Sequence, residues 1–308
     1  MDPIFVLLTV LVLLTFYLGL GIWVGLGLYA VAITSLALFR NMPVEKLVAQ
    51  LTYNTVTTPE LVALPMFILM AEILFHTRLS TSLFNGLSPW TQRLPGRMMH
   101  VNVLGCTLFA AISGSSAATA ATVGRITLSE LFRRGYDRDL VIGSLAGAGT
   151  LGFLIPPSII LIIYGVLSET SILKLFMAGI IPGLLLSICF MGYLGLRATL
   201  NPSLMPDAET APTWNDRVRS LADLGPVVFL IALVLGSMYA GIASPSEAAA
   251  VGVLGAFLVS VGQKTLNINT IRKACLGAVR TTSMIALIVA GAVFLSVSMA
   301  YLGVPRMI

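Results

Sequence analysis

Long apolar runs separated by short polar breaks make up most of the chain. A helix needs about 20 apolar residues to cross a bilayer. The apolar segments predicted from this pattern are 4–19, 22–39, 59–76, a paired stretch at 98–133, 139–167, 172–196, 225–242, 246–262 and 276–302. The first two lack the basic start and cleavage site of a signal peptide, so we interpret them as spans. The pattern therefore predicts an all-α polytopic membrane protein.

The stretch 98–133 has an unusual centre, which reads Ser113-Gly114-Ser115-Ser116. Glycine and paired serines are unfavourable inside a helix, because glycine costs backbone entropy and serine competes for backbone hydrogen bonds. In lipid, irregular backbone is tolerated only where protein or a water-filled cavity surrounds it. We therefore predict two half-helices that meet at this tip and return to the same side, which is a re-entrant hairpin.

The next apolar segment, 139–167, is interrupted at Gly149 to Gly152 and again at Ile155-Pro156-Pro157-Ser158. Pro157 removes a backbone donor and disfavours the helical conformation of the residue before it. This segment is therefore predicted to be a broken helix that unwinds near the middle of the membrane.

Composition indicates that the chain lies in a lipid bilayer, and it disfavours several functions. Hydrophobic residues make up 57% of the 308 residues and charged residues only 10%, against about 25% charged in soluble domains. The lipid bilayer must therefore cover much of the chain. The net charge of +5 is spread out, without the basic and aromatic block of a nucleic-acid binder. The three cysteines and two histidines have no metal-site spacing, and the spans carry no paired carboxylates, which disfavours an enzyme.

Charge placement supports the re-entrant hairpin. If 98–133 returns to its starting side, the loops 77–97, 133–138, 197–219 and 263–280 share one face and hold 13 of the 18 Lys and Arg residues. The opposite face then holds Arg40, Lys46 and Lys174. The positive-inside rule makes the basic face cytoplasmic and the N-terminus periplasmic.

The chain also contains a weak internal repeat. Gly21-Ile22 and Gly241-Ile242 begin similar apolar runs 220 residues apart, and the charge map gives the two halves opposite directions. This is the inverted repeat of many secondary transporters. We expect the partner of the hairpin tip near position 333, so the sequence is predicted to stop before a second hairpin.

These features suggest a domain organisation. The predicted parts are 1–97 (N-terminal scaffold-type spans with an interfacial helix), 98–198 (a transport-type region with the hairpin at 98–133 and the broken helix at 139–167), 199–223 (a cytoplasmic linker) and 224–308 (the start of the second inverted repeat).

The tip and the break suggest one chemistry. Freed carbonyl and hydroxyl oxygens suit a hard cation such as Na⁺, and the N-terminal ends of half-helices can hold an anionic group. The candidate Na⁺ site comprises Ser113, Gly114, Ser115, Ser116, Gly152, Pro156, Pro157 and Ser158, and the candidate substrate contacts are Ser115, Ser116 and Ser158. The alternative is purely structural, since small residues also let membrane helices approach closely.

Several motifs together resemble one family. The run Leu108 to Ala120 around the tip, Arg134-Gly135-Tyr136-Asp137, Gly152 to Ser158, Tyr164-Gly165 and Leu175 to Gly183 are similar to the large, DctM-type membrane subunit of tripartite ATP-independent periplasmic (TRAP) transporters. The resemblance extends over essentially the whole chain.

The resemblance implies a sodium-coupled, elevator-type importer of the bacterial inner membrane. It implies an organic acid, a carboxylate, as substrate, Na⁺ as coupling ion, and two partners: a periplasmic substrate-binding protein and a small four-helix membrane subunit. Within the family Na⁺ lies beside the hairpin tips and broken helices, which maps here only onto Ser113–Ser116 and Gly152–Ser158. The alternatives are a related carboxylate carrier that works without a binding protein, a channel or scaffold, and a membrane enzyme.

Overall fold

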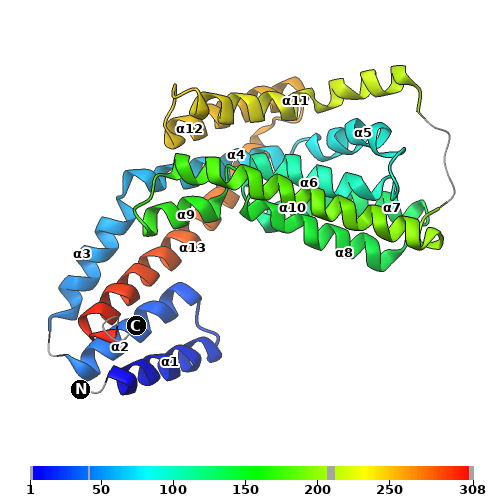
Figure 1. Ribbon diagram of the computed structural model, residues 1–308. Coiled ribbons are helices and arrows are strands. Elements are labelled where there is room, and N and C mark those ends of the chain that lie inside the picture. Colours follow the sequence, from blue (N-terminus) through cyan, green and yellow to red (C-terminus); the bar gives the residue numbers. More distant parts are fainter. Residues whose placement is uncertain (1–2, 41, 207–211, 305–308) are drawn as a thin grey trace. The chain divides into compact units, whose positions relative to one another are not determined.

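The computed structural model describes residues 3–40, 42–206 and 212–304, and all regular structure in these ranges is helical (Figure 1). The chain forms two compact units, Met1–Leu61 with Val279–Ile308 (unit 1) and Val62–Ala278 (unit 2). Unit 1 contains α1 (Pro3–Gly19), α2 (Val24–Phe39), α3 (Val44–Val56) and the later part of α13 (Ile268–Tyr301). The short η1 (Pro59–Val62) precedes unit 2.

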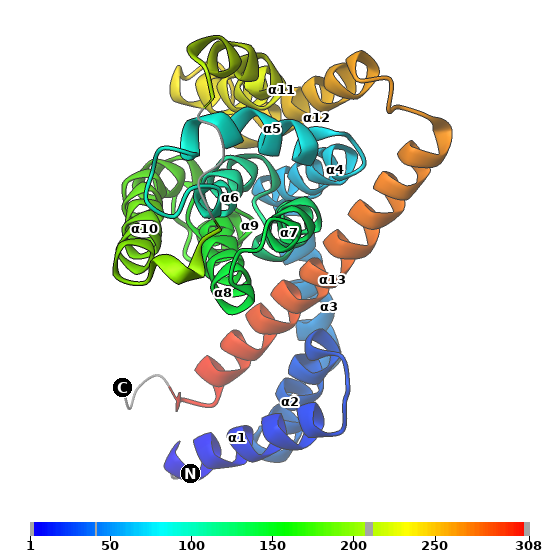
Figure 2. The ribbon, with the colours of Figure 1, turned by 90° about the vertical axis from the view of Figure 1, so that its right-hand side faces the viewer.

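Unit 2 holds most of the helices. They are α4 (Ala63–Phe75), α5 (Leu79–Thr91), α6 (Met99–Ser113), α7 (Ser116–Arg133), α8 (Arg138–Gly149), η2 (Thr150–Phe153), α9 (Ile159–Leu167), α10 (Ile172–Leu200), η3 (Pro202–Leu204), α11 (Trp214–Tyr239), α12 (Pro245–Gly262) and the start of α13. Figure 2 views α6, α7, α8 and α10 nearly end-on, with the four helices gathered into one bundle.

Four helices in the described ranges, α10, α11, α12 and α13, are long and apolar enough to cross a membrane. A fifth span results if α3 and the segment η1–α4 count together. Large apolar side chains on these helices are exposed, including Ile181 at 76%, Ile188 at 65% and Leu258 at 66%. Such surface is stable against lipid rather than water, which confirms the polytopic membrane class.

Unit 1 is held together by close packing around small residues. Gly25 of α2 lies directly against Leu287 of α13, and the ring of Tyr29 stacks on that of Phe294 with centroids 5.5 Å apart. The Tyr29 hydroxyl and the Thr52 Oγ1 atom of α3 are 2.7 Å apart, within hydrogen-bond distance. The three helices therefore share one small core, which includes Leu36 and Phe294.

Unit 2 has a larger core, and two capping boxes mark where its last helices begin. Thr213 with Asp216 caps α11, and Ser244 with Glu247 caps α12. In each pair the side-chain hydroxyl accepts a backbone N–H while the carboxylate accepts the N-cap N–H, which satisfies two otherwise unpaired donors.

Two helices begin earlier than predicted, and one helix was not predicted. Helix α11 begins at Trp214 rather than at 225, because the cap at Thr213 starts a polar, solvent-facing turn before the apolar part. Helix α13 begins at Ile268 rather than at 276. Helix α3, which the apolar pattern did not predict, is amphipathic rather than apolar. The predicted domain roles and linker concern function, and they stay predictions.

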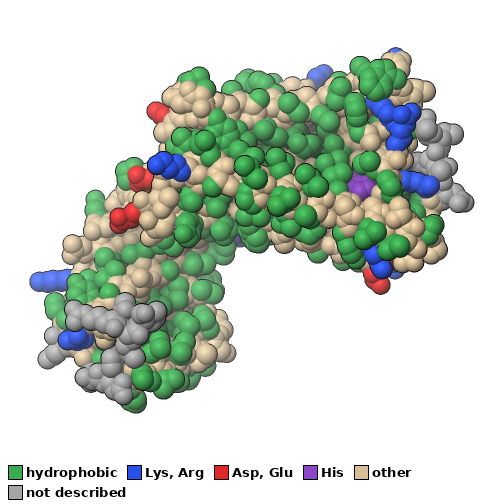
Figure 3. All heavy atoms as spheres, in the orientation of Figure 1, with side chains coloured by type: hydrophobic (Ala, Val, Ile, Leu, Met, Phe, Trp, Pro, Cys, Tyr) green, Lys and Arg blue, Asp and Glu red, His purple; other side chains and the backbone are tan. Residues whose placement is uncertain are grey.

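Basic side chains gather at one end of unit 2. Figure 3 shows Lys and Arg side chains gathered there, near the end of α10 and the start of α11. Hydrophobic side chains cover most of the rest of the visible face of unit 2. Arg133 at the end of α7, Arg138 at the start of α8, Arg197 near the end of α10 and Arg217 at the start of α11 belong to this end, which we call the basic end. Lys174 lies in the first turn of α10, at that helix's opposite end.

Candidate functional site

The predicted hairpin is present as a pair of antiparallel helices, α6 and α7. Gly114 ends α6 in the left-handed conformation, with φ +61°. Gly105 lies against Val123, and these two residues are each nine positions from Gly114. The chain therefore reverses at Gly114 and Ser115, and both arms lead back to the basic end. Re-entry into a membrane stays a prediction.

Hydroxyl groups organise the tip of the hairpin. The Oγ of Ser113 and the Oγ1 of Thr119 are 2.8 Å apart, and both side chains are fully buried. Ser115 is the N-cap of α7, and its Oγ accepts a hydrogen bond from the N–H of Ala118. No hydrogen bond of the Ser116 hydroxyl is found within the described ranges, and this side chain is half-buried.

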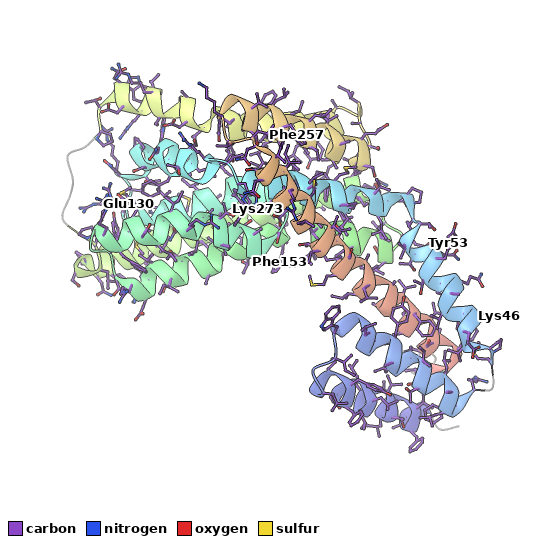
Figure 4. All side chains as sticks on the ribbon, turned by 180° about the vertical axis from the view of Figure 1, so that it is seen from behind. Lys46, Tyr53, Glu130, Phe153, Phe257 and Lys273 are labelled. Carbon is purple, nitrogen blue, oxygen red and sulfur yellow. The ribbon has the colours of Figure 1, made fainter. Side chains whose placement is uncertain are left out.

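The predicted break in 139–167 is also present. Helix α8 ends at Gly149, the 3₁₀ turn η2 follows, and residues 154–158 are not helical before α9 begins at Ile159. Ser158 is the N-cap of α9: its Oγ accepts from the N–H of Leu161 and donates to the carbonyl of Phe153 at 2.8 Å. Figure 4 labels Phe153 at this break and Glu130 near the far end of α7.

The structure brings the tip and the break together. The N–H of Ile159 donates a hydrogen bond to the carbonyl oxygen of Gly114 at 3.0 Å. A Cβ atom on Gly114 would lie 2.5 Å from the Pro157 carbonyl oxygen, and one on Gly152 would lie 2.7 Å from the Ser116 nitrogen. Two backbones can approach this closely only because both positions are glycine, which has no side chain. The two predicted halves therefore form a single site.

Helix α10 supports the broken segment from behind. A Cβ on Gly179 would collide with the Leu154 carbonyl oxygen, and one on Gly183 would lie 2.8 Å from the Ile155 side chain. Gly179 and Gly183 are four residues apart, the small-xxx-small spacing that lets membrane helices pack closely.

Polar atoms of both signs meet at this site. The carbonyl oxygens of Pro156 and Pro157 are in buried residues and accept no hydrogen bond from the described residues. The C-terminal ends of α6 and α8 bring partial negative charge, and the N-terminal ends of α7 and α9 bring partial positive charge. The site can therefore attract a cation through oxygens and an anion through N–H groups.

The predicted oxygen donors fit a sodium ion. Buried carbonyls without a partner are costly unless an ion or water satisfies them, and carbonyl and hydroxyl oxygens are the donors that hard cations prefer. Within the described residues no group of three or more His, Cys, Asp or Glu gathers that could hold a metal ion. The ligand assignment itself stays a prediction.

All eight predicted site residues lie at the junction of tip and break. Six are buried, and Ser115 and Ser116 are half-buried. Sequence reasoning missed Thr119, which the run of Ser and Thr after Gly114 could have suggested. It also missed the packing role of Gly179 and Gly183, which their four-residue spacing could have indicated.

We expect Ser158→Ala to destabilise the site. The change removes the cap of α9 and the bond to the Phe153 carbonyl, and loss of an N-cap costs about 0.5–2 kcal/mol. The midpoint of thermal unfolding of the detergent-solubilised protein should fall. Ser168→Ala, which removes an exposed hydroxyl bonded to the Tyr164 carbonyl at the other end of α9, is the matched control. Equal stability of the two variants would contradict the expected role of Ser158.

Helix ends and unpaired oxygens at a break within an apolar bundle are typical of membrane transport proteins. The chain belongs to one such family: the model of the tripartite ATP-independent periplasmic transporter, DctM component, matches residues 7–308. The chain is therefore a multi-pass membrane protein of a transporter family, and the family resemblance seen in its motifs is confirmed.

Curated relatives agree with this family. The chain is 35% identical to the ectoine/5-hydroxyectoine TRAP transporter large permease protein of Ruegeria pomeroyi, over 73% of the chain and 52% of the relative. It is 31% identical to the C4-dicarboxylate TRAP transporter large permease protein of Rhodobacter capsulatus, over 89% of the chain and 65% of the relative. It is 32% identical to the isethionate TRAP transporter permease protein of Oleidesulfovibrio alaskensis, over 74% of the chain and 35% of the relative. The chain thus spans about a third to two thirds of the length of these relatives.

Proposed function

We propose that this chain is the large membrane subunit of a sodium-coupled importer of a small organic acid. The observation that carries the proposal is the contact of hairpin tip and broken helix through the Ile159 N–H and the Gly114 carbonyl. This contact places unpaired carbonyl oxygens next to two helix N-termini. One ion and one acid group can therefore bind side by side, and each lowers the electrostatic cost of binding the other.

The acid group is supported by the kind of ligand that the relatives are named for. C4-dicarboxylates and ectoine carry carboxylates, and isethionate carries a sulfonate. Oxygen anions of this kind are stabilised at helix N-termini such as that of α7, which begins at Ser116. The N-terminus of α9 adds its partial positive charge, while its Ile159 N–H binds the Gly114 carbonyl. A carboxylate is the simplest substrate for this chain, and a sulfonate would meet the same N–H groups.

The topology that we propose is that of an inverted-repeat carrier. Both arms of the hairpin lead to the basic end, which the positive-inside rule makes cytoplasmic, and this leaves the N-terminus periplasmic. In this plan the site lies near the middle of the membrane, and a transport unit moves as a rigid body to expose it alternately to the two sides. We propose such an elevator movement in the inner membrane.

The proposed partners follow from the family. A TRAP permease is part of a tripartite system, so a periplasmic binding protein would deliver the acid and a small membrane subunit would flank this chain. A carrier that works alone is the rival proposal. Uptake of radiolabelled acid into proteoliposomes, with and without the purified binding protein and with Na⁺ or choline outside, separates the two. Uptake without the binding protein would reject the tripartite arrangement, and uptake indifferent to Na⁺ would reject the coupling.

We expect Ser116→Leu to abolish sodium-dependent uptake while leaving expression intact. Ser116 is half-buried in the first turn of α7 and its backbone lies against Gly152, so a bulky group there would crowd the contact between tip and break. Ser115→Leu should act similarly but also removes the cap of α7. Ser129→Leu, an exposed position on the same helix, should transport normally. Unchanged sodium dependence in Ser116→Leu would refute the site assignment.

A further inference from the structure

Unit 2 contains a cavity that none of the eight predicted site residues lines. Its volume is about 760 Å³, and it is lined by residues of α6, α8, α10 and η3. One end is formed by Asp137, Asp139 and Arg197, which belong to the basic end, and the other end reaches Gly147 and Cys189. A volume of about 300–1,000 Å³ is typical of a small-molecule site. We call this cavity the α8–α10 groove.

The floor of the groove is open because α8 presents glycines to it. A Cβ added to Gly143 would meet no atom within 4 Å, and one on Gly147 would lie 3.3 Å from the ring of Phe190. The walls are mostly apolar and include Phe190, Tyr193 and Leu140. An acyl chain fits such a channel, whereas a sugar or a peptide would leave its polar groups unpaired.

Among the described residues, the mouth of the groove has one charge of each sign without a partner. Asp139 and Arg197 are both exposed, and neither side chain has a hydrogen bond or ion pair within the described ranges. The neighbouring charges are already engaged: Asp137 caps α8 by accepting from the Leu140 N–H, and Arg138 stacks on the Phe132 ring. Charge complementarity therefore favours a headgroup that carries both a phosphate and an ammonium.

We propose that the α8–α10 groove binds one zwitterionic aminophospholipid, phosphatidylethanolamine, from the leaflet at the basic end. Its phosphate meets Arg197, its ammonium meets Asp139, and one acyl chain lies over Gly143 and Gly147 against Phe190. A purely anionic lipid such as phosphatidylglycerol would gain the contact with Arg197 but would face Asp139 without a cation. The proposal depends on the chain lying in a membrane and not on sodium coupling.

Photolabelling tests the proposal. The full chain in dodecyl maltoside is mixed with phosphatidylethanolamine or phosphatidylglycerol that carries a diazirine on one acyl chain, irradiated and digested, and the labelled peptides are identified by mass spectrometry. We expect label on peptides of α8 and α10. The yield of label from phosphatidylethanolamine should be about three times that from phosphatidylglycerol, the size of effect that one exposed ion pair provides. Equal labelling by both lipids would overturn the headgroup assignment, and label that avoids α8 and α10 would overturn the site.

Two pairs of variants sharpen this test. Gly143→Phe, on α8, fills the groove and should remove the label. Gly192→Phe should keep it, because Gly192 lies on α10, has open space around it and does not line the groove. Asp139→Asn changes an exposed side chain and should abolish the preference for phosphatidylethanolamine, whereas Ser129→Asn on α7 should not. If Gly143→Phe fails to fold, the Asp139→Asn result alone still decides: an unchanged preference overturns the proposal.

Discussion

Replacing Gly152 by alanine is expected to separate the hairpin tip from the broken helix and to weaken sodium binding about 10- to 100-fold, the range seen when groups that orient metal ligands are lost. A Cβ at this position would lie 2.7 Å from the nitrogen and 2.9 Å from the Cα of Ser116, and 2.8 Å from the carbonyl carbon of Ser115. All three are backbone atoms, so no side chain can rotate away. The tip itself must move, and the carbonyl oxygens beside it then lose the arrangement that we propose binds sodium.

The measurement is the sodium concentration that half-saturates thermal stabilisation of the purified chain, with choline at equal ionic strength as reference. Gly192→Ala is the matched control, because a Cβ there meets nothing within 4 Å. We expect the control to bind sodium like the unchanged protein and to be slightly more stable, since alanine is favoured over glycine in a helix by about 1 kcal/mol. Unchanged half-saturation in Gly152→Ala would show that contact of tip and break does not organise the ion site.

The two local breaks were predictable because each has a strong local cause. Gly114 ends α6 in a conformation that other residues adopt reluctantly, and Ser115 and Ser158 cap the helices that follow. Pro157 cannot continue a helix from its preceding residue. Such signals depend on one or two neighbours in the chain, so a single sequence carries them.

The pairing of the breaks was only partly predictable. Charge placement suggested that the hairpin folds back, but nothing local connects Gly114 with Ile159, which are 45 positions apart. Contacts of this kind are set by the packing of the whole bundle, including α10 through Gly179. Helix α3 was not predicted for a different reason: its polar residues Glu45, Lys46 and Gln50 interrupt any apolar run.

Two of the left-handed glycines of unit 2, Gly114 and Gly135, allow the effects of backbone strain and of close contact to be separated. Gly114 has φ +61° and its added Cβ would lie 2.5 Å from the Pro157 carbonyl oxygen, whereas Gly135 has φ +83° and open space around it. Alanine at either position should cost about 1–2 kcal/mol, because the left-handed conformation crowds its Cβ. Gly114→Ala should cost about 1–3 kcal/mol more, the usual penalty for overpacking.

Thermal unfolding of the two variants, in choline and in Na⁺, measures both effects. In choline, Gly114→Ala is expected to have a lower unfolding midpoint than Gly135→Ala. In Na⁺, Gly135→Ala should regain stability as the unchanged protein does, because its site is intact. Gly114→Ala should not, because its collision displaces the Pro157 carbonyl and breaks the hydrogen bond from the Ile159 N–H. Equal stabilisation of both variants by Na⁺ would mean that the ion binds elsewhere, since only Gly114 of the two touches the broken helix.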